Sequence, residues 1–413
     1  MPPPNLNKRP FDSISTSALT DVSPIVTMTP AELFDLGLKL FYGKGVPEDK
    51  KRAYGYILRS AAQSNNAAPN YLLGHYFAEG YGVVAISLET AMKYWKIGAA
   101  QNHRLSLYEL GRRYLHGLGV GKDQLQAIGY LDRAADLQHT ASMCVLGCLY
   151  AKVEGMLDHK KAFAYFKRAA DLGNAEGIHL VGYYYSVGQG GVEKSEETAI
   201  EYWERAAALN YSGSLHNLGR RYLRGQSVVE DKPKGIEYLT RAANLRHKSA
   251  TFELAICYLD ANGVPQNNEQ AFKYFFDAAK LGDSEAKYRV GWCYENAIGV
   301  ENDNKLAVGY YREAVQLNQV FAMYRLGCCY AEGKGVVKDE AEAFQNFLRA
   351  ANLGDASATQ KVADCYFEGK GVAKSEEAGY EWLTKAASAA AKAEGSKSVP
   401  NIAPQTRSQH HMS

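Results

Sequence analysis

The sequence predicts an all-α fold, a right-handed α-solenoid of about ten stacked antiparallel helix pairs. Two observations predict it. A motif of the form Leu-Gly-x-x-Tyr recurs every 35 to 37 residues between about residues 31 and 390, and each interval contains two segments in which apolar residues follow the helical period. A unit of about 36 residues cannot bury both of its faces alone, so neighbouring copies must stack.

The first helix of each copy carries the motif, and its second position always holds a small residue. A glycine inside a helix costs roughly 0.5–1 kcal/mol relative to alanine. Its repetition therefore implies a benefit, which we take to be the close approach of another helix, with the aromatic residue three positions later covering the gap. The small residues are Gly37, Gly74, Gly111, Gly147, Gly182, Gly219, Ala255, Gly291, Gly327 and Ala363.

A glycine-rich turn such as Gly333-Lys334-Gly335-Val336 follows the first helix. Glycine at a helix end allows the left-handed cap conformation, and the next apolar residue can pack back on the last turn. Acidic residues then stand where the second helix begins, which suits the positive end of the helix dipole. We therefore interpret these turns as helix caps rather than phosphate-binding loops, which need another spacing and a preceding strand.

The second helix carries a column of tyrosines from Tyr56 to Tyr310, followed by pairs of alanines that allow tight packing. A glycine or asparagine such as Gly173 or Asn210 then closes the helix, because both tolerate a left-handed conformation. The tyrosine column lapses to Asn346 and Glu381 in the last two copies. We expect a capping end with a wetter outer face there.

Composition bounds the class of protein. The 413 residues include 47 basic and 45 acidic side chains, a net charge of +2, which argues against a protein that coats nucleic acid. Seven cysteines are too few for a disulfide-rich secreted scaffold.

No apolar run fits a secretory signal or a membrane span, so we expect a cytoplasmic protein, with the nucleus left open. Residues 1–29 and 391–413 are predicted to be disordered tails flanking a solenoid over residues 30–390.

Together these residues resemble the Sel1-like repeat, a relative of the tetratricopeptide repeat with a longer turn. The copies that begin near Gly111, Gly291 and Gly327 fit its pattern closely, whereas the turns at Gly155-Met156 and Ser227-Val228 depart from it and are expected to bend the superhelix differently. The resemblance implies stacked antiparallel helix pairs and an adaptor that holds other proteins. It does not imply catalysis by the repeat.

Chemical motifs are sparse. Cys257, Cys293, Cys329 and Cys365 recur every 36 residues, all in first helices and without a matching cysteine in the second. Packed helix axes lie about 8–10 Å apart, too far for a disulfide, so we interpret this column as small buried apolar residues. The ten histidines share no column, and no pair of a nucleophile and a base is visible. We expect no enzyme activity, no cofactor and no metal site.

The distribution of charge along the sequence is the feature that suggests a binding site. Paired arginines, Arg112-Arg113 and Arg220-Arg221, stand in two first helices. Glu109 lies four residues before Arg113 and can pair with it, whereas no carboxylate precedes the later pair at that spacing. Residues 220–248 contain eight bases, Arg224 among them, and three acids, an excess of +5. Because first helices tend to line the concave face of such solenoids, these five arginines are candidates to bind an acidic or phosphorylated peptide.

The predicted function is that of a non-catalytic adaptor for partner proteins or peptides. Three alternatives stay open. One is a regulatory activator of a membrane-associated enzyme, of the chitin-synthase-activator type, although the chain ends without the lipidation signal common in such relatives. Another is a repeat protein that binds or hydrolyses β-lactams, which would need paired cysteines in each repeat. The third is nucleic-acid binding through the basic stretch, which the near-neutral net charge disfavours.

Overall fold

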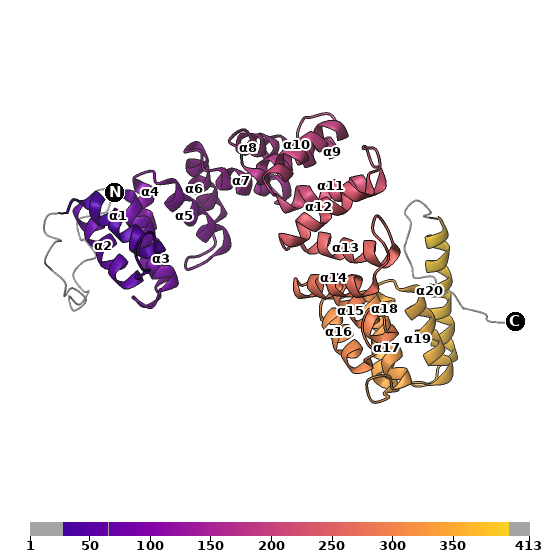
Figure 1. Cartoon of the computed structure of the whole chain (residues 1–413). Helices are drawn as coiled ribbons and strands as arrows, with labels where there is room; N and C mark the ends of the chain where they lie inside the picture. The colour runs from indigo at the N-terminus through magenta and orange to yellow at the C-terminus, as the bar shows by residue number, and fades with distance from the viewer. Residues whose placement is uncertain (1–27, 65, 396–413) are drawn as a thin grey trace. The chain divides into compact units, whose positions relative to one another are not determined.

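The computed structural model describes residues 28–64 and 66–395, and this part of the chain is built from helices, with no strand among them. Twenty helices pair consecutively (Figure 1). The first helices of the pairs are α1 (Pro30–Tyr42), α3 (Ala67–Glu79), α5 (Arg104–His116), α7 (Thr140–Lys152), α9 (Ala175–Val187), α11 (Ser212–Arg224), α13 (Lys248–Asp260), α15 (Ser284–Asn296), α17 (Val320–Glu332) and α19 (Ala356–Glu368). The second helices are α2 (Lys50–Gln63), α4 (Leu88–Ala100), α6 (Gln124–Asp136), α8 (His159–Asp171), α10 (Glu196–Ala208), α12 (Lys232–Asn244), α14 (Asn268–Lys280), α16 (Asn304–Gln316), α18 (Glu340–Asn352) and α20 (Glu376–Gly395). The predicted all-α solenoid of helix pairs is confirmed.

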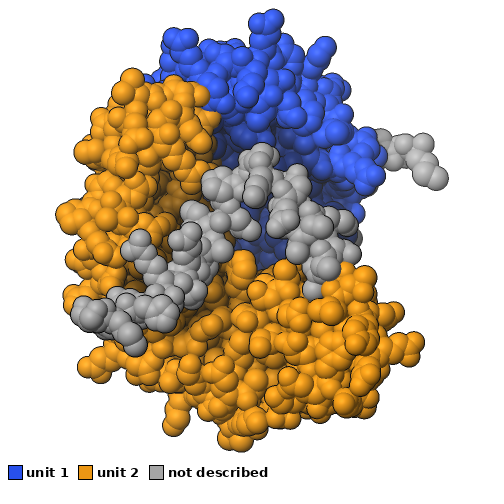
Figure 2. Space-filling view, turned by 90° about the vertical axis from the view of Figure 1, so that its right-hand side faces the viewer, with its two compact units in different colours: residues 1–206 blue, residues 207–413 orange. Residues whose placement is uncertain are grey.

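The chain divides into two compact units, residues 1–206 and 207–413, which Figure 2 shows in different colours. Unit 1 contains α1 to α9 and most of α10, and unit 2 contains α11 to α20. Within each unit a helix packs mainly on its partner in the pair and on the helix that follows in sequence. Each repeat therefore depends on its immediate neighbours, as expected for a solenoid.

The glycine of the motif lies where the two helices of a pair touch. A Cβ atom built on Gly291 would lie 2.7 Å from Tyr311 Cε1, and one on Gly327 would lie 2.6 Å from Phe347 Cε1. Similar contacts occur against Trp95, Phe166 and Trp203. The inferred close approach of another helix is confirmed, and its partner is a large buried side chain of the second helix.

The two aromatic columns of the sequence pack on each other. The ring three residues after the glycine stacks on the ring of the second-helix column, with centroids 5.5–5.9 Å apart and interplanar angles of 4–20°. The pairs are Phe77–Tyr94, Tyr114–Tyr130, Tyr150–Tyr165, Tyr185–Tyr202, Tyr222–Tyr238, Tyr258–Tyr274 and Tyr294–Tyr310. The wetter end expected at Asn346 and Glu381 is wrong for Asn346, which is 5% exposed and whose amide donates to the carbonyl oxygen of Glu342, whereas Glu381 is exposed.

The turns are helix caps, as predicted. Gly117, Gly333 and Gly369 adopt the left-handed conformation after first helices, with φ between 70 and 72°. Ala261 and Ala297 do the same without glycine, at φ 58 and 55°. Aspartates at the N-caps of six second helices accept hydrogen bonds from the first turn; they are Asp49, Asp123, Asp158, Asp231, Asp303 and Asp339.

Arginines of the second helices join neighbouring repeats. Arg133 Nη2 donates to the carbonyl oxygen of Ala99, 2.8 Å away, and to Asn102 Oδ1 at the end of the preceding second helix. Arg241 repeats this arrangement with Ala207 and Asn210, and Arg168 repeats it with Ala135 and Asp136. Each guanidinium thus satisfies a terminal carbonyl and lies at the negative end of a helix dipole. We call this contact the arginine staple.

The predicted tails lie almost wholly outside the described residues. Thr29 is described as the N-cap of α1, where it forms a capping box with Glu32, and α20 extends to Gly395. Among the described residues, no helix is both long and apolar enough to cross a membrane.

Candidate interaction surface

Each first helix carries one stripe of residues beside the small residue that faces its partner, and the inner members of the stripe, such as Phe252, Tyr288 and Tyr324, also contact a ring of the second helix. The stripe consists of the positions six and three residues before the small residue of the motif and one and five residues after it, which share a helical face. We call these positions the first-helix stripe. In unit 2 its members include His216, Arg220 and Arg224 on α11; Phe252, Ile256 and Asp260 on α13; Tyr288, Trp292 and Asn296 on α15; Phe321, Tyr324, Cys328 and Glu332 on α17; and Gln360, Asp364 and Glu368 on α19.

The structure separates the three candidate arginines of α11. Arg220 and Arg224 lie on the stripe; the Arg220 side chain is 42% exposed, and Arg224 is exposed in the last turn of the helix. Arg221 lies one position further round, where α13, α15 and α17 place buried cysteines, and like Arg220 it is partly buried with its Nε shielded from solvent. The cations of α11 that lie on the stripe are therefore Arg220 and Arg224, one helical turn apart.

A carboxylate from the next repeat reaches the α11 arginines. Glu253 of α13 places Oε1 3.2 Å from Arg220 Nε and Oε2 3.4 Å from His216 Nε2. This partner is 33 residues away, so a search within the helix could not find it. Glu253 neutralises part of the excess charge, whereas the structure shows no ion pair to Arg224 among the described residues.

Two histidines stack beside this carboxylate. The rings of His216 and His247 have centroids 4.8 Å apart, and His247 Nδ1 accepts from the backbone N–H of Ala250 as the N-cap of α13. Burial lowers the pKa of His247, and the neighbouring His216 lowers it further. A neutral His247 is what the cap requires, since Nδ1 must keep its lone pair.

The two candidate arginines of unit 1, Arg112 and Arg113, contact neighbouring side chains of unit 1. Arg112 is 45% exposed on the stripe of α5, with Nη1 3.6 Å from Glu109 Oε1. Arg113 turns towards α4, and its guanidinium carbon lies 4.8 Å from the centre of the Trp95 ring. The sequence predicts that Glu109 pairs with Arg113; the structure pairs it with Arg112, because Arg113 occupies the position that faces the second helix.

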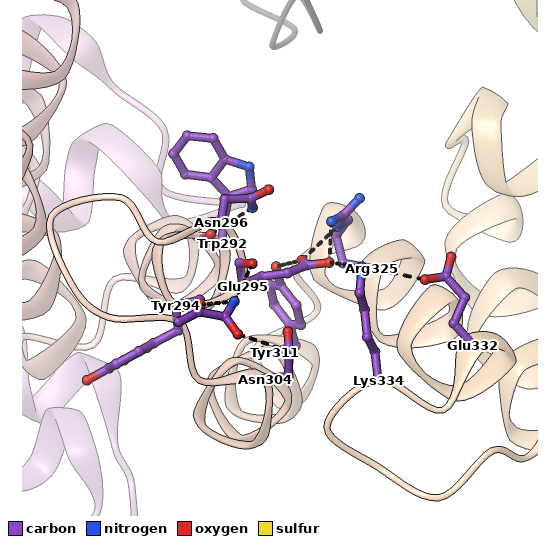
Figure 3. Close-up of polar contacts among 10 residues, drawn as sticks. Trp292, Tyr294, Glu295, Asn296, Asn304, Tyr311, Arg325, Glu332 and Lys334 are labelled. Atoms are coloured by element: carbon purple, nitrogen blue, oxygen red, sulfur yellow. Dashed lines mark hydrogen bonds and ion pairs between the residues drawn. The ribbon is translucent and has the colours of Figure 1, made fainter. Parts of the chain in front are cut away.

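A buried ionic network lies next to the stripe, and the sequence motifs do not predict it (Figure 3). The side chain of Glu295, on α15, is 6% exposed, and its Oε1 lies 2.5 Å from Arg325 Nη2 of α17. Tyr311 of α16 donates to Glu295 Oε2 at 2.6 Å. Lys334 is 4.0 Å from the same carboxylate and half exposed. The network joins two repeats through three helices.

Burial and the charge of Glu295 determine the protonation states of Tyr311 and Arg325. Burial and the charge of Glu295 both raise the pKa of Tyr311. Burial alone would lower the pKa of Arg325, but the hydrogen bond and charge of Glu295 outweigh it and raise the pKa. Tyr311 therefore remains a hydrogen-bond donor and Arg325 a cation throughout the ordinary pH range.

Alignment of the repeats with one another contains the signal that reveals this network. Glu295 stands four residues after the glycine of the motif, a position that the other copies fill with Phe, Ala, Leu or Ser. A lone acid in a column of apolar and small residues indicates a buried charge that needs a partner.

The described residues offer little for cofactor or nucleophilic chemistry. All seven cysteines are free thiols, and Cys257, Cys293, Cys329 and Cys365 are buried, as predicted for the cysteine column. Burial raises the pKa of Cys257, Cys293 and Cys329 to about 12, so these thiols are poor nucleophiles at neutral pH. Within residues 28–64 and 66–395, no group of three or more His, Cys, Asp or Glu side chains is placed to hold a metal ion.

Comparisons with known proteins agree with this architecture. The family model of the Sel1 repeat matches ten segments between residues 33 and 390. A crystal structure of a protective antigen of uropathogenic Escherichia coli that displays an SLR fold aligns at 24% identity with a TM-score of 0.63, covering 89% of this chain and 80% of that one. A Sel1 repeat protein from Oxalobacter formigenes aligns at 29% identity with a TM-score of 0.51, covering 74% of this chain and 89% of that one. No curated protein matches the sequence.

Proposed function

Because the chain belongs to the Sel1 repeat family, we propose that it is a non-catalytic adaptor that holds a partner protein on the first-helix stripe of unit 2. Folds of this family commonly mediate protein–protein interactions. The finer part of the proposal is the chemistry of the partner: an acidic or phosphorylated segment that pairs with the arginines of α11.

One observation carries this proposal. Arg220 and Arg224 lie one turn apart on the same stripe, and no described acid pairs with Arg224. A guanidinium presents parallel N–H donors that match a carboxylate or a phosphate. Arg220 already contacts Glu253 through Nε, so its terminal nitrogens are the donors left to turn towards a ligand.

The test is affinity co-purification of the tagged full-length chain from its own cells, beside the variant Arg224→Glu. Arg220→Glu is a poorer variant, because it would place a second carboxylate beside Glu253 and destabilise the contact between α11 and α13. A matched control, Lys273→Glu/Lys305→Glu, changes two exposed lysines on the second helices α14 and α16. A stoichiometric partner that the control keeps and Arg224→Glu loses supports the proposal. A partner that both variants keep moves the binding site away from α11.

The alternatives have no specific observation in their favour. A β-lactam-binding repeat protein would use paired cysteines, and all seven here are free. The enzyme-activator type and the nucleic-acid type rest on no described contact. A cytoplasmic location stays a prediction.

A further inference from the structure

The first-helix stripe of unit 2 changes character one helix after the arginines. On α13, α15 and α17 the stripe carries partly exposed apolar or aromatic side chains: Phe252, Ile256, Trp292, Phe321 and Tyr324, which we call the aromatic patch. Phe321 is 50% exposed, and the other four are partly buried. Clustered apolar side chains left partly in water mark interaction surfaces more often than isolated ones do.

One member of the aromatic patch reaches the preceding repeat. The Phe321 ring of α17 lies 6.0 Å from the ring of Tyr288 on α15 and remains 50% exposed. Trp292 stands on the same stripe one turn further along α15, and Figure 3 shows its indole and the Arg325 guanidinium on the side of the helices away from Asn304. Glu295 pairs with Arg325 and accepts a hydrogen bond from Tyr311.

We infer that the partner segment is bipartite: an acidic or phosphorylated residue binds Arg220 and Arg224, and a large apolar residue of the same segment covers the aromatic patch. The inference rests on the proposed function and names the ligand of that site more closely. Charge complementarity places the acidic end of the segment at α11, and the partly exposed aromatic side chains require an apolar residue at its other end.

The spacing of the two anchors can be derived from helix packing. First helices of neighbouring repeats touch through side chains, as Arg220 of α11 and Glu253 of α13 do, and we take their axes to be about 10 Å apart, so that α15 lies about 20 Å from α11. An extended chain covers about 3.3 Å per residue, and about six residues therefore separate the acidic group from an apolar residue at Trp292. An α-helical segment would need about twice as many residues to cover this distance.

The experiment uses fluorescein-labelled peptides in which three aspartates are separated from a Trp-Leu pair by two, four, six or eight Gly/Ser residues. Binding to the full-length chain is measured by fluorescence anisotropy. We expect the six-residue spacer to bind about tenfold tighter than a peptide with the aspartates alone. Phe321→Ser and Trp292→Ser should remove that gain, and Lys273→Glu/Lys305→Glu should keep it. Circular dichroism of each variant checks that it is folded.

The outcomes separate the two proposals. If the aspartates alone bind as tightly as any peptide with Trp-Leu, and Arg224→Glu abolishes this binding, the arginine site stands and the bipartite ligand is wrong. If the apolar pair binds equally well to Arg224→Glu, the arginine site is wrong. No binding of any peptide at about 1 mM contradicts the bipartite ligand. If the wild-type chain sediments as a dimer and Phe321→Ser makes it a monomer, a second copy of the chain covers the aromatic patch. This result would also overturn the inference.

Discussion

At the scale of single residues, the repeats are informative where one copy departs from the others. Glu295 occupies a column of apolar and small side chains, and it is stabilised there by Arg325 and Tyr311 rather than by water. The pair loses hydration on both sides, so its net contribution is smaller than its geometry suggests. Removing only one partner destabilises the fold more strongly, because the other partner then keeps its charge without compensation.

We expect Glu295→Ala to lower the free energy of unfolding by about 3 kcal/mol, since Arg325 would be left largely buried and unpaired. Lys334→Met, which removes the exposed cation at 4.0 Å, should change it by less than about 0.5 kcal/mol. Urea unfolding followed by circular dichroism measures both. Equal effects of the two substitutions would show that the buried contact has no special weight.

The glycine of the motif gives a second test at this scale. Gly327→Ala would place a Cβ 2.6 Å from Phe347, so the helices must shift apart, and we expect a loss of about 1–3 kcal/mol. Gly309→Ala is the matched control on α16, where nothing lies within 4 Å of the new Cβ. It should stabilise the chain by about 0.5–1 kcal/mol. In urea unfolding we therefore expect the free energy of unfolding to fall for Gly327→Ala and to rise for Gly309→Ala. A rise for both variants would contradict the prediction.

At the scale of helices, the starts of several first helices depend on histidine. His103, His139 and His247 are N-caps whose Nδ1 accepts a backbone N–H. Each ring packs on an aromatic ring of the preceding first helix, Tyr71, Tyr108 or His216. A cap of this kind works only while the imidazole is neutral.

These caps make stability depend on pH. Burial lowers the pKa of all three histidines from the ordinary 6.5, so below pH 6.5 the unfolded chain takes up protons that the folded chain refuses. Their stabilisation is complete above pH 6.5 and is lost as the pH falls towards the lowered values. We expect the urea midpoint to drop between pH 7.5 and 5.5, and to drop less in His103→Asn/His139→Asn/His247→Asn. An unchanged drop in this triple variant would assign the pH dependence to other groups.

The arginine staple predicts a gain of stability where it is missing. Thirty-six residues after Arg241 the chain has Asp277, and the turn residue that matches Asn210 is Arg246. The two do not pair; an open cavity of about 330 Å³ lies between α12 and α14, with Ala243, Arg246 and Asp277 in its lining. Arg246→Asn/Asp277→Arg restores the pattern and should add about 1 kcal/mol to the free energy of unfolding. Arg241→Met should remove a similar amount, and urea unfolding compares them.

The sequence predicts elements well here because each repeat restates the same local rules. Glycine at the contact with the second helix, left-handed caps and buried cysteines all depend on positions within a single repeat. Contacts between repeats do not. Arg220 meets Glu253 and Glu295 meets Arg325 only because of the register between neighbouring first helices, which no single repeat specifies. For the same reason the sequence alone makes Arg221 equivalent to Arg220, although one helical position turns it away from the stripe.

At the scale of the whole molecule, each compact unit has the contacts it needs among its own repeats. The core cluster around Tyr311 and Phe347 and the cluster around Phe275 lie entirely within unit 2. Stability in such chains is approximately the sum of repeats and nearest-neighbour contacts. We therefore expect the repeats of unit 2 to fold without those of unit 1.

We expect a fragment of residues 209–395 to fold without the rest of the chain. It keeps α11 to α20 and their pairing and loses α10, together with the Ala207 carbonyl that accepts from Arg241 of α12. Circular dichroism should show a helical protein that unfolds cooperatively in urea, with a lower midpoint than the full chain. A fragment that lacks helical signal at 25 °C would show that unit 2 depends on the preceding repeats.

The cysteine column allows the local opening of individual repeats to be measured by alkylation. Cys257, Cys293, Cys329 and Cys365 sit in four consecutive repeats, and the high pKa and burial of the first three shield them from alkylation in the closed state. An alkylating reagent added at neutral pH will therefore modify each thiol only when its repeat transiently opens. Peptide masses measured over time would give an opening rate for each of these four repeats, without any introduced probe.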